Sequence, residues 1–158
     1  MMMTKFEIVF QECEKAFLAE EERTNNLAGK TEKLILALTA IMGFNLIVIP
    51  APPWKTLYLM VPISAFLILG ISLILALWSL FTREYQGYPR GNTLIDELKG
   101  QQITTDEARV KIAKMYLSAS ENNASINDTK AALLKFCVCL MILGFALAIT
   151  SKLFASSF

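Results

Sequence analysis

Residues 57–81 read LYLMVPISAFLILGISLILALWSLF, a run that contains no charged side chain. A helix needs about 20 predominantly apolar residues to cross the hydrocarbon core of a bilayer. The run is long enough to do so with some tilt. It therefore predicts a membrane-spanning helix, with Trp78 at one end and Tyr58 at the other in the positions typical of interfacial aromatic residues.

Two further apolar runs flank this segment. The first, residues 34–49, reads LILALTAIMGFNLIVI and is followed by three prolines that cannot continue a helix. The short sequence APPWKT then leads into the second run, so the first two helices are predicted to form an antiparallel hairpin. The third run covers residues 131–154. The sequence thus predicts an all-α integral membrane protein with three transmembrane helices.

Composition supports this prediction. Hydrophobic residues make up 54% of the chain and charged residues 18%, against about 25% charged residues in soluble domains. All acidic residues lie outside the three apolar runs. The net charge of +1 gives no indication of a nucleic-acid partner, and none is expected. Three cysteines without any histidine supply no zinc site, so we expect no metal and no cofactor.

Lysine and arginine indicate the orientation. Residues 1–33 contain five of these side chains and residues 82–130 contain seven, whereas the hairpin contains Lys55 alone. Positive charge is retained on the cytoplasmic side. We therefore expect the amino terminus and residues 82–130 on the cytoplasmic side of the membrane and the carboxyl terminus outside.

The amino-terminal segment is predicted to be helical. Apolar side chains recur near the helical period, and no proline separates this segment from the first span, so one continuous helix is expected from Lys5 to Ile49. The apolar stripe comprises Phe6, Val9, Phe10, Cys13, Phe17 and Leu18.

Residues 82–103 contain several glycines and a proline and predict a bent connector, with a short helical piece at 94–98. A long helix is then expected from Thr104, because Thr104 and Glu107 have the spacing of a capping box. This helix either continues into the third span or loosens near Asn122 and Asn123. Its apolar stripe comprises Ala108, Ile112, Met115, Tyr116 and Ala119.

An apolar stripe on a helix in water is buried against another apolar surface. The two cytoplasmic helices are therefore predicted to pair through their stripes and to form a bundle continuous with the spans. The core of such a pair is small, and we expect a homo-oligomer. The predicted organisation is an amino-terminal helix at 1–33, a transmembrane hairpin at 34–81, a cytoplasmic connector and helix at 82–130, and a third span with a short tail at 131–158.

No nucleotide-binding glycine loop, nucleophile elbow or histidine base occurs, so no enzymatic activity is predicted. Polar residues inside spans are costly in lipid. Thr39, Asn45 and Lys135 are interpreted either as interhelical hydrogen-bonding and snorkelling residues or as pore-lining and gating residues.

Two polar clusters flank the membrane on the cytoplasmic side. They are either solvated faces that bond to each other or a binding site for a trigger. The candidate trigger-binding residues are Arg23, Asn25, Asn26, Lys30, Tyr116, Asn122, Asn123 and Lys130, and Thr24, Asn127 and Asp128 lie among them.

Three features accompany the predicted spans. The pattern Arg23-x-x-x-Leu27-x-x-Lys30 precedes the first span, an asparagine-containing segment runs from Tyr116 to Asn123, and Lys130 leads into the third span. This layout resembles the small bacterial transmembrane antiviral effectors of the SLATT-like and Pycsar-effector families, over residues 20–154. The resemblance implies an oligomer that breaches the inner membrane once infection is sensed. Either a soluble sensor protein relays the signal, or a small nucleotide binds between helices of the oligomer.

The leading hypothesis is therefore an oligomeric pore-forming or membrane-disrupting effector triggered through its cytoplasmic helices, with membrane lipid as its environment. The alternative is a membrane anchor or scaffold subunit that regulates a partner enzyme or complex. A small channel or transporter is a third hypothesis, although three spans without inverted repeats argue against a secondary transporter.

Overall fold

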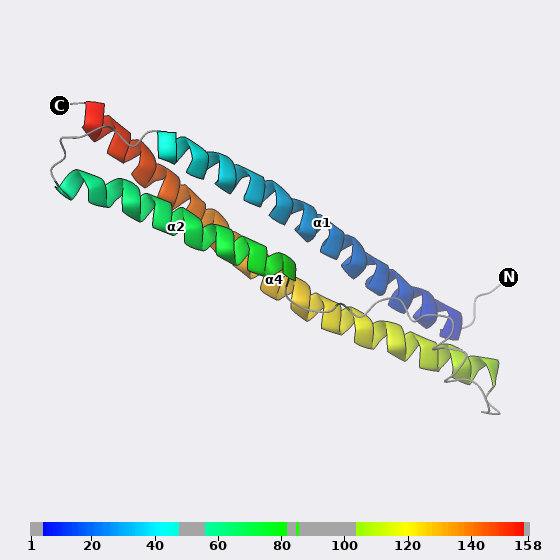
Figure 1. Cartoon of the computed structure of the whole chain (residues 1–158). Helices are drawn as coiled ribbons and strands as arrows, with labels where there is room; N and C mark the ends of the chain where they lie inside the picture. Colours follow the sequence, from blue (N-terminus) through cyan, green and yellow to red (C-terminus); the bar gives the residue numbers. More distant parts are fainter. Residues whose placement is uncertain (1–4, 48–55, 82–84, 86–103, 157–158) are drawn as a thin grey trace. The chain divides into compact units, whose positions relative to one another are not determined.

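The computed structural model describes residues 5–47, 56–81, 85 and 104–156, and all regular structure within them is helical. Helix α1 spans Lys5–Ile47, α2 spans Thr56–Phe81 and α4 spans Thr105–Ser156 (Figure 1). The predicted continuous first helix is confirmed from Lys5 to Ile47. The second long helix is also continuous, without a break at Asn122 or Asn123.

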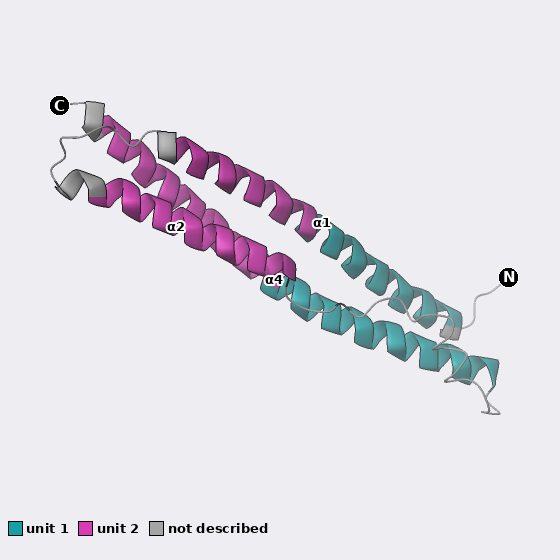
Figure 2. Cartoon of the chain, viewed as in Figure 1, with its two compact units in different colours: residues 1–27, 83–129 teal, residues 28–82, 130–158 magenta. Residues whose placement is uncertain are grey.

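The chain divides into two units (Figure 2). Unit 1 comprises residues 1–27 and 83–129, and unit 2 comprises residues 28–82 and 130–158. Helices α1 and α4 each contribute residues to both units, whereas α2 belongs to unit 2.

Unit 1 is built around a pairing of α1 with α4. Its buried core consists of Phe17, Tyr116 and Ala119, with Phe10, Cys13 and Ile112 packed against it. The Tyr116 ring lies 5.8 Å from that of Phe10 and 5.6 Å from that of Phe17, both centroid to centroid. Contacts between the helices run from Glu7–Arg109 through Phe17–Tyr116 to Arg23–Asp128, so residue numbers rise together and the two helices are parallel. The predicted pairing of the amino-terminal helix with the helix that begins near Thr104 is thus found in unit 1.

The buried face of α1 in unit 1 is narrower than the predicted stripe. Val9 is 55% exposed and Leu18 is 48% exposed. The side chains that turn inward are spaced alternately three and four residues apart, at Phe10, Cys13, Phe17, Glu20, Thr24 and Leu27. This spacing is the heptad pattern of a coiled coil, in which a seam of two positions per heptad faces the partner.

The beginning of α4 follows the predicted capping box. Thr104 Oγ1 accepts a hydrogen bond from the backbone amide of Glu107 at 3.3 Å. The Glu107 carboxylate in turn accepts from the backbone amide of Thr104 at 2.8 Å. Two amides at the helix start are therefore satisfied by side chains, which fixes the helix boundary at this position.

Unit 2 packs α2 against α4 through small side chains. The inward positions of α2 again alternate by three and four residues, at Ala65, Leu69, Ser72, Ala76 and Ser79. A Cβ added to Gly144 of α4 would lie 2.7 Å from Leu69 Cγ. Ser72 Oγ donates a hydrogen bond to the carbonyl oxygen of Cys137 at 2.9 Å. The small-residue spacings Ser72/Ala76 and Gly144/Ala148 thus permit the close approach for which they are known.

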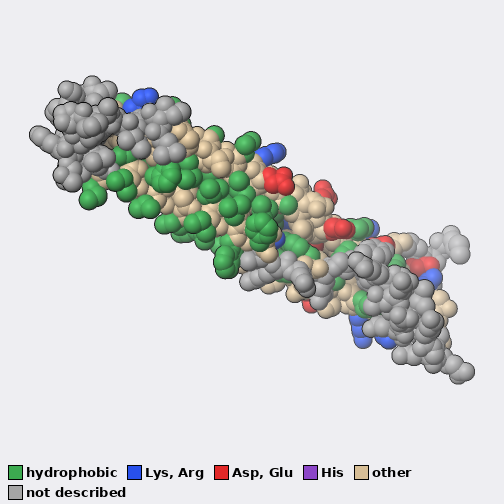
Figure 3. Space-filling model, viewed as in Figure 1, with side chains coloured by type: hydrophobic (Ala, Val, Ile, Leu, Met, Phe, Trp, Pro, Cys, Tyr) green, Lys and Arg blue, Asp and Glu red, His purple; other side chains and the backbone are tan. Residues whose placement is uncertain are grey.

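Large apolar side chains cover the outside of unit 2. On α2 the exposed ones include Met60, Ile63, Leu67, Ile71, Ile74, Trp78 and Phe81. Figure 3 shows many hydrophobic side chains gathered along this helix. By length and composition, α2 over Met60–Phe81 and α4 within Thr105–Leu153 are able to cross a membrane, and 28% and 22% of their most apolar windows are buried.

Several predictions concern residues that the structure does not describe. The last two residues of the expected first span at 34–49, the prolines that follow it and the helical piece at 94–98 all lie outside the described residues.

Candidate functional site

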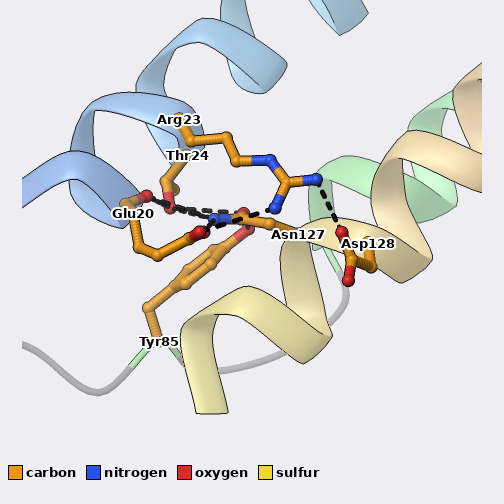
Figure 4. Close-up of polar contacts among 6 residues, drawn as sticks. All are labelled: Glu20, Arg23, Thr24, Tyr85, Asn127 and Asp128. Carbon is orange, nitrogen blue, oxygen red and sulfur yellow. Dashed lines mark hydrogen bonds and ion pairs between the residues drawn. The ribbon is translucent and has the colours of Figure 1, made fainter. Parts of the chain in front are cut away.

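Asn127 lies at the centre of a polar layer within unit 1 (Figure 4). It follows Ala119 of the aromatic core by eight residues, or about two helical turns. Its side chain is fully buried. The amide nitrogen Nδ2 donates to Glu20 Oε2 at 2.8 Å and lies 3.1 Å from the Glu20 carbonyl oxygen. The amide oxygen Oδ1 accepts from the Tyr85 hydroxyl at 3.0 Å. The layer thus joins α1, α4 and the segment that follows α2.

Thr24 completes the layer from α1. Its hydroxyl donates to the carbonyl oxygen of Glu20 at 2.8 Å, and Oγ1 lies 3.2 Å from Asn127 Nδ2. A threonine hydroxyl has one proton, so donation to the nearer carbonyl leaves Oγ1 as an acceptor for Asn127. A buried amide requires such partners, because an unpaired polar group in a core costs about 1–3 kcal/mol.

An ion pair closes the layer on its solvent side. Arg23 Nη2 lies 2.6 Å from Asp128 Oδ1, and Arg23 Nη1 lies 3.5 Å from Glu20 Oε1. The hydrogen bond to Asp128, together with both neighbouring carboxylates, raises the pKa of Arg23 above its ordinary value. The side chains of Arg23 and Asp128 are 39% and 71% exposed. An exposed pair of this kind contributes about 0–1 kcal/mol, so the ion pair aligns the helices more than it stabilises them.

The structure separates the predicted trigger-binding residues into three groups. Arg23 belongs to the polar layer, Tyr116 belongs to the aromatic core, and Asn123 is buried at 3% exposure. A second group points to solvent and comprises Asn25, Asn26 and Asn122. Lys30 and Lys130 belong to unit 2, with Lys30 exposed and Lys130 half-buried. The two polar clusters of the sequence analysis bond to each other within unit 1, through the side chains of Arg23, Thr24, Asn127 and Asp128.

The predicted pore residues also differ from one another. Asn45 is buried at 4% exposure, on the inward side of α1 in unit 2. Thr39 is exposed, and its hydroxyl bonds to the carbonyl oxygens of Ile35 and Leu36 on its own helix. Lys135 is exposed. Among the described residues, Ser79 Oγ is a buried side-chain oxygen without a hydrogen-bond partner.

Sequence reasoning missed Glu20 and Tyr85. Glu20 had a detectable signal, because it follows Phe17 by three residues and precedes Thr24 by four, in register with the heptad. Tyr85 had none, because it lies within the connector at residues 82–103, where no helical period relates it to the two stripes.

The layer is suited to specifying how α1 and α4 pair. The described residues contain no group of three or more side chains able to hold a metal ion. The bonding atoms of Asn127 are all used within the layer. A buried polar position in a coiled coil fixes register and partner, because any shifted arrangement leaves the amide unpaired.

No family model, curated protein or solved structure matches this chain.

Proposed function

We propose that this chain is inserted in a bacterial inner membrane through unit 2 and acts there as an oligomeric effector that breaches the membrane. The observation that carries the proposal is the distribution of side chains on α2 in unit 2, which is the reverse of that on a helix of a soluble protein. Among the inward side chains of α2, Leu69 is large and Ala65, Ser72 and Ser79 are small, whereas many large apolar side chains of this helix face outward. In water such an arrangement would expose a row of large apolar side chains along α2, and contiguous exposed apolar surface of this kind marks a site of interaction with a membrane or a protein.

The proposal includes a third span formed by α1. From Leu34 onward this helix carries no charge. Leu34 and Leu38 are buried, while Leu36 is 72% exposed and Phe44 is 50% exposed. This pattern matches that of α2, with an inward seam and an apolar exterior suited to lipid.

Helix continuity supports control of the membrane part by unit 1. Both α1 and α4 pass from residues of unit 1 to residues of unit 2 without an interruption of the helix. A trigger that engages unit 1, either a soluble sensor protein or a small nucleotide, would then act on helices that also form the spans. The polar layer around Asn127 is the proposed point of control, since it determines how α1 and α4 pair.

Infection supplies the trigger for a test. Bacteria expressing the chain would be infected with a panel of phages while a potential-sensitive dye reports the membrane potential. The parent chain is expected to depolarise the membrane after infection and not before it. Asn127→Leu is expected to remove this dependence on infection, whereas the control Asn122→Leu, at an exposed position of the same helix, is expected to retain it. An unchanged potential and normal growth in every infection would contradict an effector role.

A scaffold role is the second candidate, and exposed apolar residues of unit 1 favour it. Ile8, Val9, Leu18 and Leu117 are between 46% and 55% exposed in a region rich in charge. Such residues are suited to docking a partner. Purification distinguishes the candidates: a stoichiometric partner and liposomes that remain sealed would support the scaffold, whereas leakage from liposomes containing the chain alone would support the effector.

A further inference from the structure

Unit 2 contains an apolar groove between α1 and α4. Its volume is about 270 Å³. Among its lining residues Ala148 is 7% exposed, whereas Phe44 of α1 and Phe145 of α4 are 50% and 41% exposed. The groove is lined by Ile41, Phe44, Phe145, Ala148, Ile149 and Lys152, among others. A narrow apolar groove lined by aromatic side chains and a small buried one suits a flexible hydrocarbon chain.

One cation lies at this groove. Lys152 Nζ is 5.1 Å from the centroid of the Phe44 ring, within the range in which an ammonium group is attracted to an aromatic face. The Lys152 side chain is exposed, so its ammonium group is accessible to a partner.

The sequence excludes a carboxylate of a second copy as that partner at the same depth. Residues 34–81 and 131–158 contain no aspartate and no glutamate. A neighbouring copy would therefore bring apolar surface but no side-chain anion to Lys152. The phosphate of a lipid headgroup supplies the anion, and its acyl chain supplies the apolar part.

The depth of Lys152 fits a headgroup. Seventeen residues separate Lys135 from Lys152, which corresponds to about 26 Å along an α-helix. The hydrocarbon core of a bilayer is about 30 Å thick. Both lysines therefore reach the headgroup regions by extending their side chains, one at each face of the membrane.

We propose that this groove binds an anionic phospholipid, with an acyl chain over Ala148 between Phe44 and Phe145 and the phosphate paired with Lys152. The inference rests on the proposed insertion of unit 2 in a membrane. It adds a specific lipid to that proposal and does not depend on the effector role.

Native mass spectrometry tests the site on the full chain purified in dodecyl maltoside, with phosphatidylglycerol or phosphatidylcholine added. The parent chain is expected to retain phosphatidylglycerol preferentially. Lys152→Gln should weaken that retention about fivefold, which corresponds to about 1 kcal/mol for one lysine at a headgroup. Lys152→Arg should preserve the preference. Ile149→Trp, which narrows the groove and leaves the charge in place, should reduce retention of the lipid, whereas the control Lys135→Gln lies outside the groove and should leave the preference unchanged.

Three results would overturn the site. They are equal retention of the two lipids by the parent chain, an unchanged preference in Lys152→Gln, and efficient cross-linking of two Ile149→Cys copies above the level of the parent chain. The last result would place a second copy in the groove. A chain that stays soluble without detergent would instead refute membrane insertion itself, so the two proposals fail in distinguishable ways.

Discussion

The seams of the two units share a spacing and differ in content. In unit 1 the seam holds the aromatic rings of Phe17 and Tyr116, and charged side chains face outward. In unit 2 the α2 seam is mostly small, with Ala65, Ser72 and Ala76 beside Leu69, and several leucine and isoleucine side chains face outward. Water favours the first arrangement, because the apolar area that it buries is the driving force. Lipid favours the second, because close packing and interhelical hydrogen bonds replace that force.

The largest effect is expected from a substitution that disrupts the aromatic seam of unit 1. Phe17→Ala removes a side chain that is 1% exposed and contacts Tyr116. We expect the free energy of unfolding of unit 1 to fall by about 3–5 kcal/mol, as for other buried phenylalanines. Thermal unfolding followed by circular dichroism measures the change. Leu18→Ala, at a neighbouring residue that is 48% exposed, is the matched control and should change stability little. Equal effects of the two substitutions would refute the heptad seam.

A smaller effect is expected from crowding the small-residue seam. In Gly144→Ala the new Cβ would meet Leu69 Cγ at 2.7 Å, and overpacking of this kind costs about 1–3 kcal/mol. Gly70→Ala has open space and should stabilise its helix by up to about 1 kcal/mol, because alanine is the better helix former. The melting temperatures of the two variants in detergent should move in opposite directions. Stabilisation by both would show that α2 and α4 do not approach closely.

The smallest expected effect concerns the start of α4. Hydrogen bonds from the backbone and side chain of Thr104 lower the pKa of Glu107 below its ordinary value. A lowered pKa means that the capping box stabilises the helix above the unfolded pKa of about 4.3 and that this stabilisation is lost as the pH falls through the folded value. Helicity measured between pH 7 and pH 3 should show this loss in the parent chain. Glu107→Gln should remove that part of the pH dependence, and an identical profile in both proteins would contradict the prediction.

Much of the helical structure could be predicted from the sequence, because its causes are local. The capping box of Thr104 and Glu107, the uninterrupted helix from Lys5 and the small residues near Gly144 are all visible as short patterns. The pairing of the two apolar stripes could be predicted because both need to be buried away from water. These features depend on neighbours within one or two helical turns.

The exposed and buried sides of α1 were predicted less accurately. A stripe drawn at the helical period includes Val9 and Leu18, but a paired helix buries a seam that repeats every 3.5 residues. Whether the broader stripe or the narrower seam is buried depends on the partner helix. The same holds for the candidate site, because the partners of Asn127 come from Glu20 and Tyr85, far away in sequence. A single sequence contains no signal for such contacts beyond the heptad position of Glu20.

The parallel pairing of α1 with α4 has a consequence during synthesis. Arg23 and Asp128 are 105 residues apart in the chain. A ribosome adds about 5–20 residues per second, so the aromatic seam of α1 leaves the ribosome roughly 5–20 s before its partner exists. During this interval Phe10 and Phe17 are open to chaperones and to completed copies nearby. Closing so long a loop also slows folding relative to a helical hairpin with local contacts.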